Sequence, residues 1–393
     1  MVENLKEAMK NSRKKARETI YNNTDGYKKK VYWDNSLQSW VVVDNKIARS
    51  ILTSSNYSAD RKGEFIDQID ATQKQKNVLK EFYTNWLMYM EGEKHEKFRK
   101  LIQKAVNQIK EFIPEISQKV TKTIMSQKLE YIDAVNDVAK PYTNLFLSQV
   151  FGLSKEKYSQ VLDSAQEAVN FLWIANPSKN DIDKTVASIE KITKEINEII
   201  LNNNYDKDGL FKTMLENSVD SKIFTVALIN MIIDGHEPFQ SSLLNLIFNY
   251  LHIKNRENVD ICDKDIVSES IRMDPPFSYC ARVCVVRSNI EDKVINVGER
   301  IMIILYVSNN NHLNVDNPTD ITCKHSKKEN LSFGFGKHHC LGAQMTTISL
   351  EYFLKSFKKL DFHYKWRIVN YEKETTYGFF EINKMTIESE SQK

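Results

Sequence analysis

The segment from Leu331 to Gln344, LSFGFGKHHCLGAQ, surrounds one cysteine with three glycines and two histidines. It leads directly into LGAQMTTISLEYFLKSFKKL, an amphipathic run that predicts a long helix. Unsatisfied N–H groups at the start of a helix favour an anion, so they stabilise a thiolate at Cys340. The glycines allow unusual backbone angles and let the backbone approach a flat ligand closely. The role of Cys340 therefore decides what this chain does.

Several roles are open to Cys340 on these residues alone. A catalytic nucleophile needs an activating base, and His338 or His339 could provide one. A zinc site would add Cys323 and His325, but the spacing C-x-H followed by HHC matches no usual zinc pattern. A redox thiol or a small buried residue would need no ligand. A thiolate bound to haem iron suits the whole loop, because backbone N–H groups can tune the sulfur.

The spacing of this loop carries a resemblance to a known family. Phe333, Gly336, Cys340 and Gly342 reproduce the pattern Phe-x-x-Gly-x-x-x-Cys-x-Gly, which resembles the cysteine-ligand loop of the cytochrome P-450 family. The resemblance implies a haem b, iron protoporphyrin IX, with the Cys340 thiolate as the metal ligand. It also implies that three loop residues lie against the cofactor: Phe333, Gly334 and Gly342.

Charged pairs elsewhere fit the same resemblance. Glu269 and Arg272 in SESIRMDPP stand one helical turn apart and resemble the family's pair that locks a helix to the loop before the cysteine. His95 and Arg99 in EKHEKFRK share one helix face and resemble residues that reach the haem propionates. On spacing alone, both pairs also suit ordinary charged helix surfaces. Asn330 stands where the family often has a propionate-binding histidine. Two further propionate ligands are implied: Arg282 and His338.

One helix departs from the family pattern. VALINMIIDGHEPFQSSLLNLIFNYL predicts a long buried helix with a polar island, and it resembles the helix that lines the oxygen site. Gly235 and Glu237 match that helix, whereas Asp234 replaces a small residue and Pro238 replaces the threonine. Proline lacks an N–H and clashes with the preceding turn, so the helix should bend or open. We expect protons to travel through Glu237, with Ser241 as a helper.

Composition excludes several classes of protein. The 393 residues are 41% hydrophobic and 27% charged, which fits a globular protein with a large core. A net charge of +3 is too small for a typical nucleic-acid binder. No apolar run is long enough to span a bilayer, and the charged N-terminus lacks a signal-peptide core. We therefore expect a cytoplasmic protein that binds neither membrane nor nucleic acid. Five cysteines without framework spacing make a disulfide scaffold unexpected.

The order of predicted elements favours a single cytochrome P-450 domain over residues 1–393, mainly α with a minor β part and small β-sheets. KKKVYWDNSLQSWVVVDN predicts a hairpin, with Asp44 capping the next helix. Residues 73–250 mostly predict helices. SYCARVCVVRSNIEDKVINVGERIMIILYVS predicts short strands, a loop follows from Asn309 to Lys337, and YEKETTYGFFEINKMTIES predicts a final hairpin. The parts are a β-rich segment at about 28–60, a helical core at about 73–275 and the Cys-ligand loop at 331–342.

The resemblance implies a haem-thiolate monooxygenase that inserts one oxygen atom from O2 into a small organic substrate, such as a secondary metabolite. The chain has no flavin or nicotinamide fingerprint, so a ferredoxin or flavodoxin-type donor with its reductase is expected. Pro238 keeps other outcomes open, namely oxidative coupling, desaturation, peroxygenation and dehydration. A haem-binding sensor, or a helical interaction protein without haem, is the alternative of a different class. The basic residues expected to face the donor are Arg99, Lys100, Lys104 and Lys337.

The substrate itself cannot be read from this sequence, but the resemblance indicates which segments line its pocket. These are the stretch after Tyr57, Phe171–Trp173, Ile233–Asp234, Phe277–Ala281 and Thr376–Tyr377. Phe171 and Trp173 are equally compatible with an ordinary hydrophobic core.

Overall fold

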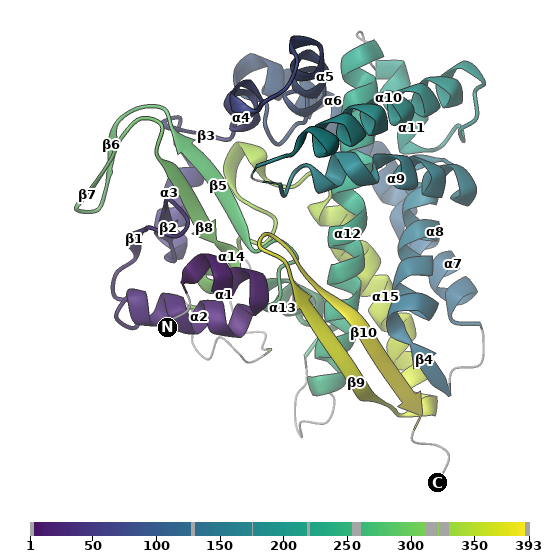
Figure 1. The fold of residues 1–393 in the computed structure, drawn as a ribbon. Helices are drawn as coiled ribbons and strands as arrows, with labels where there is room; N and C mark the ends of the chain where they lie inside the picture. Colours follow the sequence, from purple (N-terminus) through teal and green to yellow (C-terminus); the bar gives the residue numbers. More distant parts are fainter. Residues whose placement is uncertain are drawn as a thin grey trace. The chain divides into compact units, whose positions relative to one another are not determined.

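The computed structural model describes residues 4–126, 130–174, 176–217, 221–253, 261–311, 321 and 330–389. Helices dominate and short strands form small sheets, which confirms the predicted mainly α fold with a minor β part (Figure 1). The chain forms two compact units. The first joins Met1–Ser58, Ser117–Pro141 and Pro238–Lys393, and the second joins Ala59–Ile116 and Tyr142–Glu237. The single-domain organisation stays a prediction. Within the ranges above, no helix combines the length and the apolar composition needed to cross a bilayer.

The first unit is built around a five-stranded sheet. Its strands follow the order β1 (Val31–Asp34), β2 (Ser39–Val42), β8 (Arg300–Ile304), β5 (Tyr279–Cys284) and β3 (Tyr57–Ser58). β1 and β2 pair antiparallel with Val31 opposite Val42, which confirms the predicted hairpin. Asp34 closes its turn, because Oδ1 accepts hydrogen bonds from the backbone N–H of Ser36 at 2.9 Å and of Leu37 at 3.0 Å.

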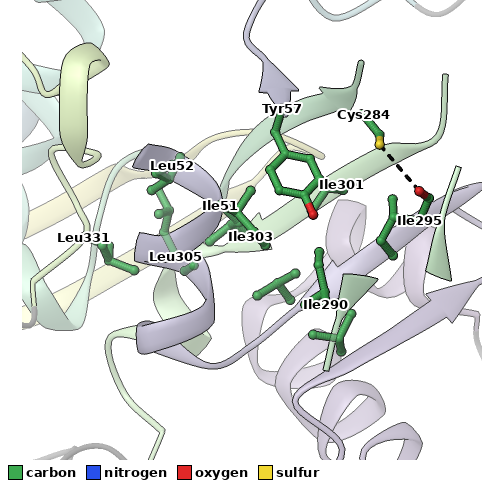
Figure 2. Packing of buried hydrophobic residues seen from close by; sticks show 13 residues of the cluster. Ile51, Leu52, Tyr57, Cys284, Ile290, Ile295, Ile301, Ile303, Leu305 and Leu331 are labelled. Carbon is green, nitrogen blue, oxygen red and sulfur yellow. Dashed lines mark hydrogen bonds between the residues drawn. The ribbon is translucent and has the colours of Figure 1, made fainter. Parts of the chain in front are cut away.

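A hydrophobic core joins this sheet to α3 (Asn45–Thr53), as Figure 2 shows. Ile51 and Leu52 of α3 and Ile303 of β8 are almost completely buried in one cluster. Leu331 is fully buried in the same cluster. Because Leu331 begins the cysteine loop, burial of its side chain anchors one end of that loop to the sheet.

Further elements complete the first unit. Two helices, α1 (Leu5–Asn11) and α2 (Arg13–Asn23), precede the sheet. β6 (Ser288–Ile290) and β7 (Lys293–Ile295) form a two-stranded sheet, and β4 (Tyr131–Asp133), β10 (Phe380–Ser389) and β9 (Trp366–Thr375) form a three-stranded one in that order. The helical elements are η2 (a π-helix, Ala134–Ala139), α13 (Asp263–Met273), α14 (Leu305–Ser308), η4 (Gly336–His338) and α15 (Ala343–Tyr364).

The second unit is helical. It contains α4 (Lys62–Gln68), α5 (Gln73–Tyr83), α6 (Gly92–Ile109), η1 (Lys110–Phe112), α9 (Lys155–Asn170), α10 (Lys179–Leu201) and α11 (Leu210–Asn217). Three helices have residues in both units, namely α7 (Ile113–Ile124), α8 (Lys140–Phe151) and α12 (Ser221–Ile253). Buried hydrogen bonds join α5, α9 and α10. Tyr83 Oη donates to the Ala168 carbonyl at 2.7 Å, and Ser188 Oγ donates to the Ser164 carbonyl at 2.6 Å.

Most predicted elements are confirmed, and one is wrong. Asp44 caps α3 by accepting from the Ile47 N–H at 3.0 Å, and β9 and β10 form the predicted terminal hairpin. The predicted strand ending IILYVS is wrong at its end, because Leu305–Ser308 is the short helix α14. A short apolar run does not distinguish a buried strand from a buried helical turn. Residues 312–320 and 322–329 of the predicted loop Asn309–Lys337 lie outside the described residues.

Candidate functional site

The cysteine loop closes on itself through backbone hydrogen bonds. The N–H of Cys340 donates to the Phe333 carbonyl at 2.8 Å, and the N–H of His339 donates to the Gly336 carbonyl at 3.1 Å. Cys340 forms no disulfide with a described residue, and its side chain is exposed. The loop therefore presents the sulfur outward on a backbone that its own hydrogen bonds hold in place.

The start of α15 lies directly after this sulfur. Gly342 is the N-cap of the 22-residue helix, so the positive end of a long helix dipole lies close to Cys340. A Cβ placed on Gly342 would lie 3.8 Å from the Cys340 Sγ and within 4 Å of no other atom outside its immediate chain neighbours. An exposed thiol beside open space and a helix N-terminus fits an iron-bound thiolate with a flat ligand over it.

Two glycines of the loop adopt left-handed backbone angles. Gly334 has a φ of 71° and Gly336 has a φ of 72°. Gly336 also approaches α3, because a Cβ there would lie 2.8 Å from the Leu52 carbonyl oxygen. The nearest such atom to a Cβ on Gly334 is the His338 carbonyl oxygen, at 3.6 Å. Of these two glycines, Gly336 is the one where a Cβ would clash with the backbone of another element.

We expect Gly336→Ala to destabilise the protein more than Gly334→Ala. Left-handed angles cost an alanine about 1–2 kcal/mol at either position. At Gly336 the contact with Leu52 should add about 1–3 kcal/mol of overpacking to the loss in unfolding free energy. Urea unfolding of the two variants isolates the contact, since their φ angles are almost the same. Equal losses in both variants would show that the close approach to α3 has no energetic weight.

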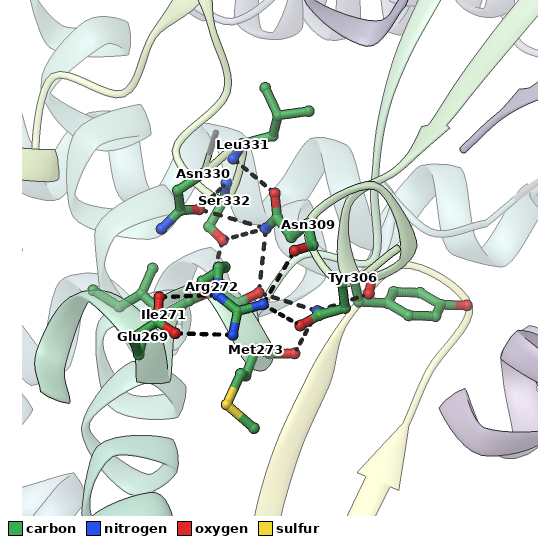
Figure 3. A network of polar contacts seen from close by, with 10 residues as sticks. Glu269, Ile271, Arg272, Met273, Tyr306, Asn309, Asn330, Leu331 and Ser332 are labelled. Carbon is green, nitrogen blue, oxygen red and sulfur yellow. Dashed lines mark hydrogen bonds and ion pairs between the residues drawn. The ribbon is translucent and has the colours of Figure 1, made fainter. Parts of the chain in front are cut away.

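A buried ion pair on α13 confirms the architectural role predicted for Glu269 and Arg272. Arg272 Nε and Nη2 donate to the two Glu269 carboxylate oxygens at 2.9 and 3.0 Å (Figure 3). Arg272 is 2% exposed and Glu269 is 4% exposed. Arg272 Nη1 also donates to the Asn309 carbonyl at 3.1 Å and to Asn310 Oδ1 at 2.7 Å. One guanidinium therefore joins α13 to the segment after α14.

Asn309 extends this network to the cysteine loop. Its Oδ1 accepts from the Leu331 N–H at 2.8 Å, and its Nδ2 donates to Ser332 Oγ at 2.9 Å. Ser332 Oγ in turn donates to the Ile271 carbonyl at 2.7 Å (Figure 3). Asn330 Oδ1 accepts from the Ser332 N–H at 2.9 Å, so the residue in the usual histidine position shapes the loop entry. The sequence did not single out Asn309 or Ser332, because neither belongs to a spaced motif.

The predicted propionate ligands are divided between the two units. Arg282 on β5 and His338 in η4 belong to the first unit, where Arg282 is 7% exposed and donates to the Ala281 carbonyl at 2.8 Å. His95 and Arg99 lie on α6 of the second unit, and His95 is 1% exposed.

Trp86 is a polar group that sequence reasoning missed. The residue is fully buried in the second unit, and its Nε1–H finds no acceptor among the described residues. Its ring packs against Phe82, Tyr83 and Tyr89. A buried N–H without an acceptor is uncommon and suits a hydrogen bond to a bound group. A lone tryptophan carries no spacing signal, so only burial reveals it.

α12 runs without interruption through Pro238, so the predicted opening does not end the helix. Asn230 Nδ2 donates to Asp234 Oδ2 one turn away. Asp234 is half-buried, and loss of hydration raises its pKa to about 7; the Asn230 hydrogen bond opposes the rise, and the nearby Glu237 charge adds to it. A Cβ on Gly235 would meet no atom within 4 Å beyond its own chain neighbours and helix backbone, so the helix surface beside Asp234 is open.

The side chains of two other polar residues of α12 contact residues on other elements. Ser241 is buried, and its Oγ donates to the Phe380 carbonyl on β10 at 2.7 Å. His236 Nδ1 lies 3.2 Å from Tyr158 Oη, and burial lowers the pKa of His236 to about 4. His236 is therefore neutral at physiological pH and faces α9. Glu237 is exposed.

The structure brings two of the predicted pocket segments together in the first unit. Phe277 and Phe379 form an isolated β-bridge, with their rings 5.7 Å apart edge to face. Tyr279 and Tyr377 repeat this arrangement at 5.6 Å. In the second unit Phe171 is fully buried, with its ring stacked on another aromatic ring, whereas Trp173 is 44% exposed. Phe171 is therefore core, which agrees with the structural alternative.

The zinc-binding alternative for Cys340 is not supported by the described residues. Cys323 and His325 lie outside the described residues. Within the described ranges, no three His, Cys, Asp or Glu side chains gather as a metal site. No disulfide joins the described cysteines, which are Cys262, Cys280, Cys284 and Cys340.

Comparisons with known proteins agree with this geometry. Residues 251–364 match the family model described as Cytochrome P-450. The Biotin biosynthesis cytochrome P-450 of Bacillus subtilis (strain 168) is 22% identical over 252 residues, which cover 60% of this chain and 64% of that protein. The Steroid C26-monooxygenase of Mycobacterium tuberculosis (strain CDC 1551 / Oshkosh) is 22% identical over 230 residues, covering 56% and 61%. Both alignments span less than two thirds of the relative.

Solved structures match over nearly the whole chain. The crystal structure of P450BioI, in complex with acyl carrier protein ligated to hexadec-9Z-enoic acid, has a TM-score of 0.80 and 17% identity. It covers 96% of this chain and 100% of that one. At this identity the match concerns the fold alone. The fold, the match over residues 251–364 and the spacing of the Cys340 loop are similar to those of cytochrome P-450 proteins.

Proposed function

We propose that this protein is a haem-thiolate monooxygenase that inserts one oxygen atom from O2 into a small organic substrate. The exposed Cys340 thiol, held beside open space at the start of α15, is the observation that carries this proposal. The relative from M. tuberculosis, named a monooxygenase, supports it. A bound haem b supplies the one-electron and oxygen chemistry that side chains lack.

The chain's own residues have distinct parts in this proposal. Cys340 ligates the iron, and the N–H groups at the start of α15 stabilise the negative sulfur. Cationic or polar groups bind the propionates, since carboxylates need charge-assisted hydrogen bonds when buried. These groups are His95, Arg99, Arg282 and His338. The residues that lie against the cofactor are Phe333, Gly334 and Gly342.

Electrons come from a separate donor in this proposal, a ferredoxin or flavodoxin with its reductase. Lys100 and Lys104 are exposed one turn apart on α6, beside Arg99. Lys337 is exposed in the cysteine loop. Exposed positive charge attracts an acidic carrier and mainly raises its rate of association.

Reversing both charges, Lys100→Glu with Lys104→Glu, should slow reduction by an acidic ferredoxin about tenfold at low ionic strength. Added salt should narrow the difference, because screening weakens long-range attraction. Stopped-flow reduction measures the rate. The matched control is Lys119→Glu with Lys122→Glu, which makes the same charge change at exposed positions of α7. Equal slowing in both double variants would place the donor elsewhere.

The reaction is tested with isotopically labelled O2. Spectral shifts across a compound library identify a ligand, and turnover with a ferredoxin and reductase then generates product. We expect one labelled oxygen atom in each product molecule. Product without that atom would favour coupling, desaturation or dehydration, which Pro238 keeps as the second candidate. Tight ligand binding with no turnover would favour a haem-binding sensor.

A further inference from the structure

The N-terminal helices α1 and α2 pack against two predicted pocket residues, Tyr279 on β5 and Tyr377 before β10. The helices form one hydrophobic cluster with Met302 and Ile304 of β8, and both tyrosines pack against that cluster. Since the two tyrosine rings lie 5.6 Å apart edge to face, the helices support the place where two predicted pocket segments meet. The helix residues in the cluster are Leu5, Ala8, Met9, Ala16 and Ile20.

Arg13, the first residue of α2, contacts three other segments of the first unit. Its Nη2 donates to the Pro275 carbonyl at 2.5 Å and to the Pro276 carbonyl at 3.3 Å. Its guanidinium carbon lies 4.0 Å from the centroid of the Phe380 ring and 4.8 Å from that of the Tyr306 ring. A cation this close to an aromatic face is attracted to the ring. One side chain therefore holds α2 to β10, to α14 and to the segment before β5.

The contacts of Arg13 lie beside both predicted pocket segments, Phe277–Ala281 and Thr376–Tyr377. The two prolines directly precede the first segment, and Phe380 comes shortly after the second. The backbone joins the segments at the same point, because the Phe380 N–H donates to the Pro276 carbonyl at 2.9 Å. That carbonyl also accepts from Arg13. Arg13 therefore binds where the backbones of the two segments meet.

The burial of Arg13 calls for a physical reason, since the residue is 7% exposed and a buried charge is costly. Burial lowers the pKa of Arg13 to about 9, and the charge of Asp274 opposes this shift, so the guanidinium stays cationic at neutral pH. An apolar side chain could pack against both rings. A guanidinium also fixes the direction of the proline carbonyls through hydrogen bonds, which favours control of position over packing alone.

We propose that Arg13 is a positioning residue that sets the spacing of the two predicted pocket segments and thereby the shape of the substrate pocket. The inference rests on the proposed monooxygenase function, which requires such a pocket. Arg13 acts through Pro276 and Phe380, so it need not touch the substrate. Without the guanidinium, the two segments keep their contacts with each other but lose their common attachment to α2.

Hydrogen exchange of backbone amides measures this positioning without ligand or turnover. Two amides bond across the segments: the Phe380 N–H to the Pro276 carbonyl and the Ser278 N–H to the Gly378 carbonyl, each at 2.9 Å. In Arg13→Ala both should exchange at least about tenfold faster, because the attachment that limits their opening is lost. Amides of the β1–β2 hairpin should keep their rates. Arg13→Lys should recover part of the protection, since an ammonium can donate to the same carbonyls.

Arg17→Ala is the matched control on the same helix. Arg17 donates to the Met273 carbonyl at 3.5 Å and lies 5.5 Å from the Tyr306 ring centroid. Among the described residues, its contacts include neither Phe380 nor the two prolines. This variant should leave the amides that bond across the segments close to their parent rates. Equal effects of the two variants would overturn the inference, as would faster exchange of every measured amide in Arg13→Ala.

Azole titrations of the haem-loaded protein extend the test to the pocket. Clotrimazole carries several aromatic rings and should bind Arg13→Ala about three- to tenfold more weakly, because a loosened wall must be ordered on binding. Imidazole is small and should bind within about twofold of the unmodified protein. Equal weakening of both azoles would overturn the inference, as would unchanged clotrimazole affinity despite faster exchange. An unmodified protein that takes up no haem and binds neither azole would overturn the proposed function instead, whatever the exchange rates show.

Discussion

Replacing Cys340 with alanine will abolish the red-shifted Soret band that a reduced haem-thiolate gives with carbon monoxide. The sulfur is the iron ligand in the proposed site, and the other described cysteines cannot take its place. Cys284 is buried at the end of β5 (Figure 2), and Cys262 precedes α13. Turnover should be lost with the band, because an iron without its thiolate does not support the same oxygen chemistry.

Cys262→Ala is the matched control for this substitution, since Cys262 is also an exposed free thiol. It should keep both the band and the activity. Far-ultraviolet circular dichroism of both variants checks that the helices are intact. A Cys340→Ala protein that retained the red-shifted band would contradict the assignment of Cys340 as the metal ligand.

Arg272→Ala should lower the free energy of unfolding by about 3–5 kcal/mol, because it leaves the Glu269 carboxylate buried without its partner. The same change removes the donor to Asn309 and Asn310, which connects α13 to the start of the cysteine loop (Figure 3). We therefore expect weaker haem retention as well as lower stability. Urea unfolding and the amount of haem bound per protein measure the two effects.

Lys358→Ala provides a control on the same helix pair. Lys358 of α15 and Asp263 of α13 form an ion pair at 2.8 Å, and both side chains are about one third exposed. A solvated pair contributes about 0–1 kcal/mol, so this variant should stay close to the parent in stability. A similar small loss in Arg272→Ala would mean that the buried network does not hold the loop.

Local sequence signals predicted the elements that begin or turn at a short polar side chain bonded to backbone N–H groups. Asp44 identified the start of α3, and the turn at Asp34 identified the β1–β2 hairpin, because short polar side chains satisfy backbone N–H groups there. α1 and α2 were not predicted. Their buried faces consist of a few residues, Leu5, Ala8, Met9, Ala16 and Ile20, within a charged segment. Tertiary packing rather than local pattern stabilises such helices.

In the candidate site, too, the sequence predicted some residues and missed others. Spacing identified Cys340 and the Glu269–Arg272 pair, because a helical turn fixes which side chains meet. Asn309 holds the start of the cysteine loop through a hydrogen bond with Leu331, which lies 22 residues further along the chain. No local sequence pattern predicts this contact. Asp234 is half-buried and Glu237 is exposed, a difference within one short segment that no local pattern predicts.

The most direct test of the account is the carbon monoxide difference spectrum of the reduced, purified protein. We expect haem b to copurify and the spectrum to show the red-shifted Soret band of a thiolate ligand, since the exposed Cys340 thiol lies at the start of α15. A band at the position typical of histidine-ligated haem would contradict the account. So would a folded protein that binds no haem when haem is supplied.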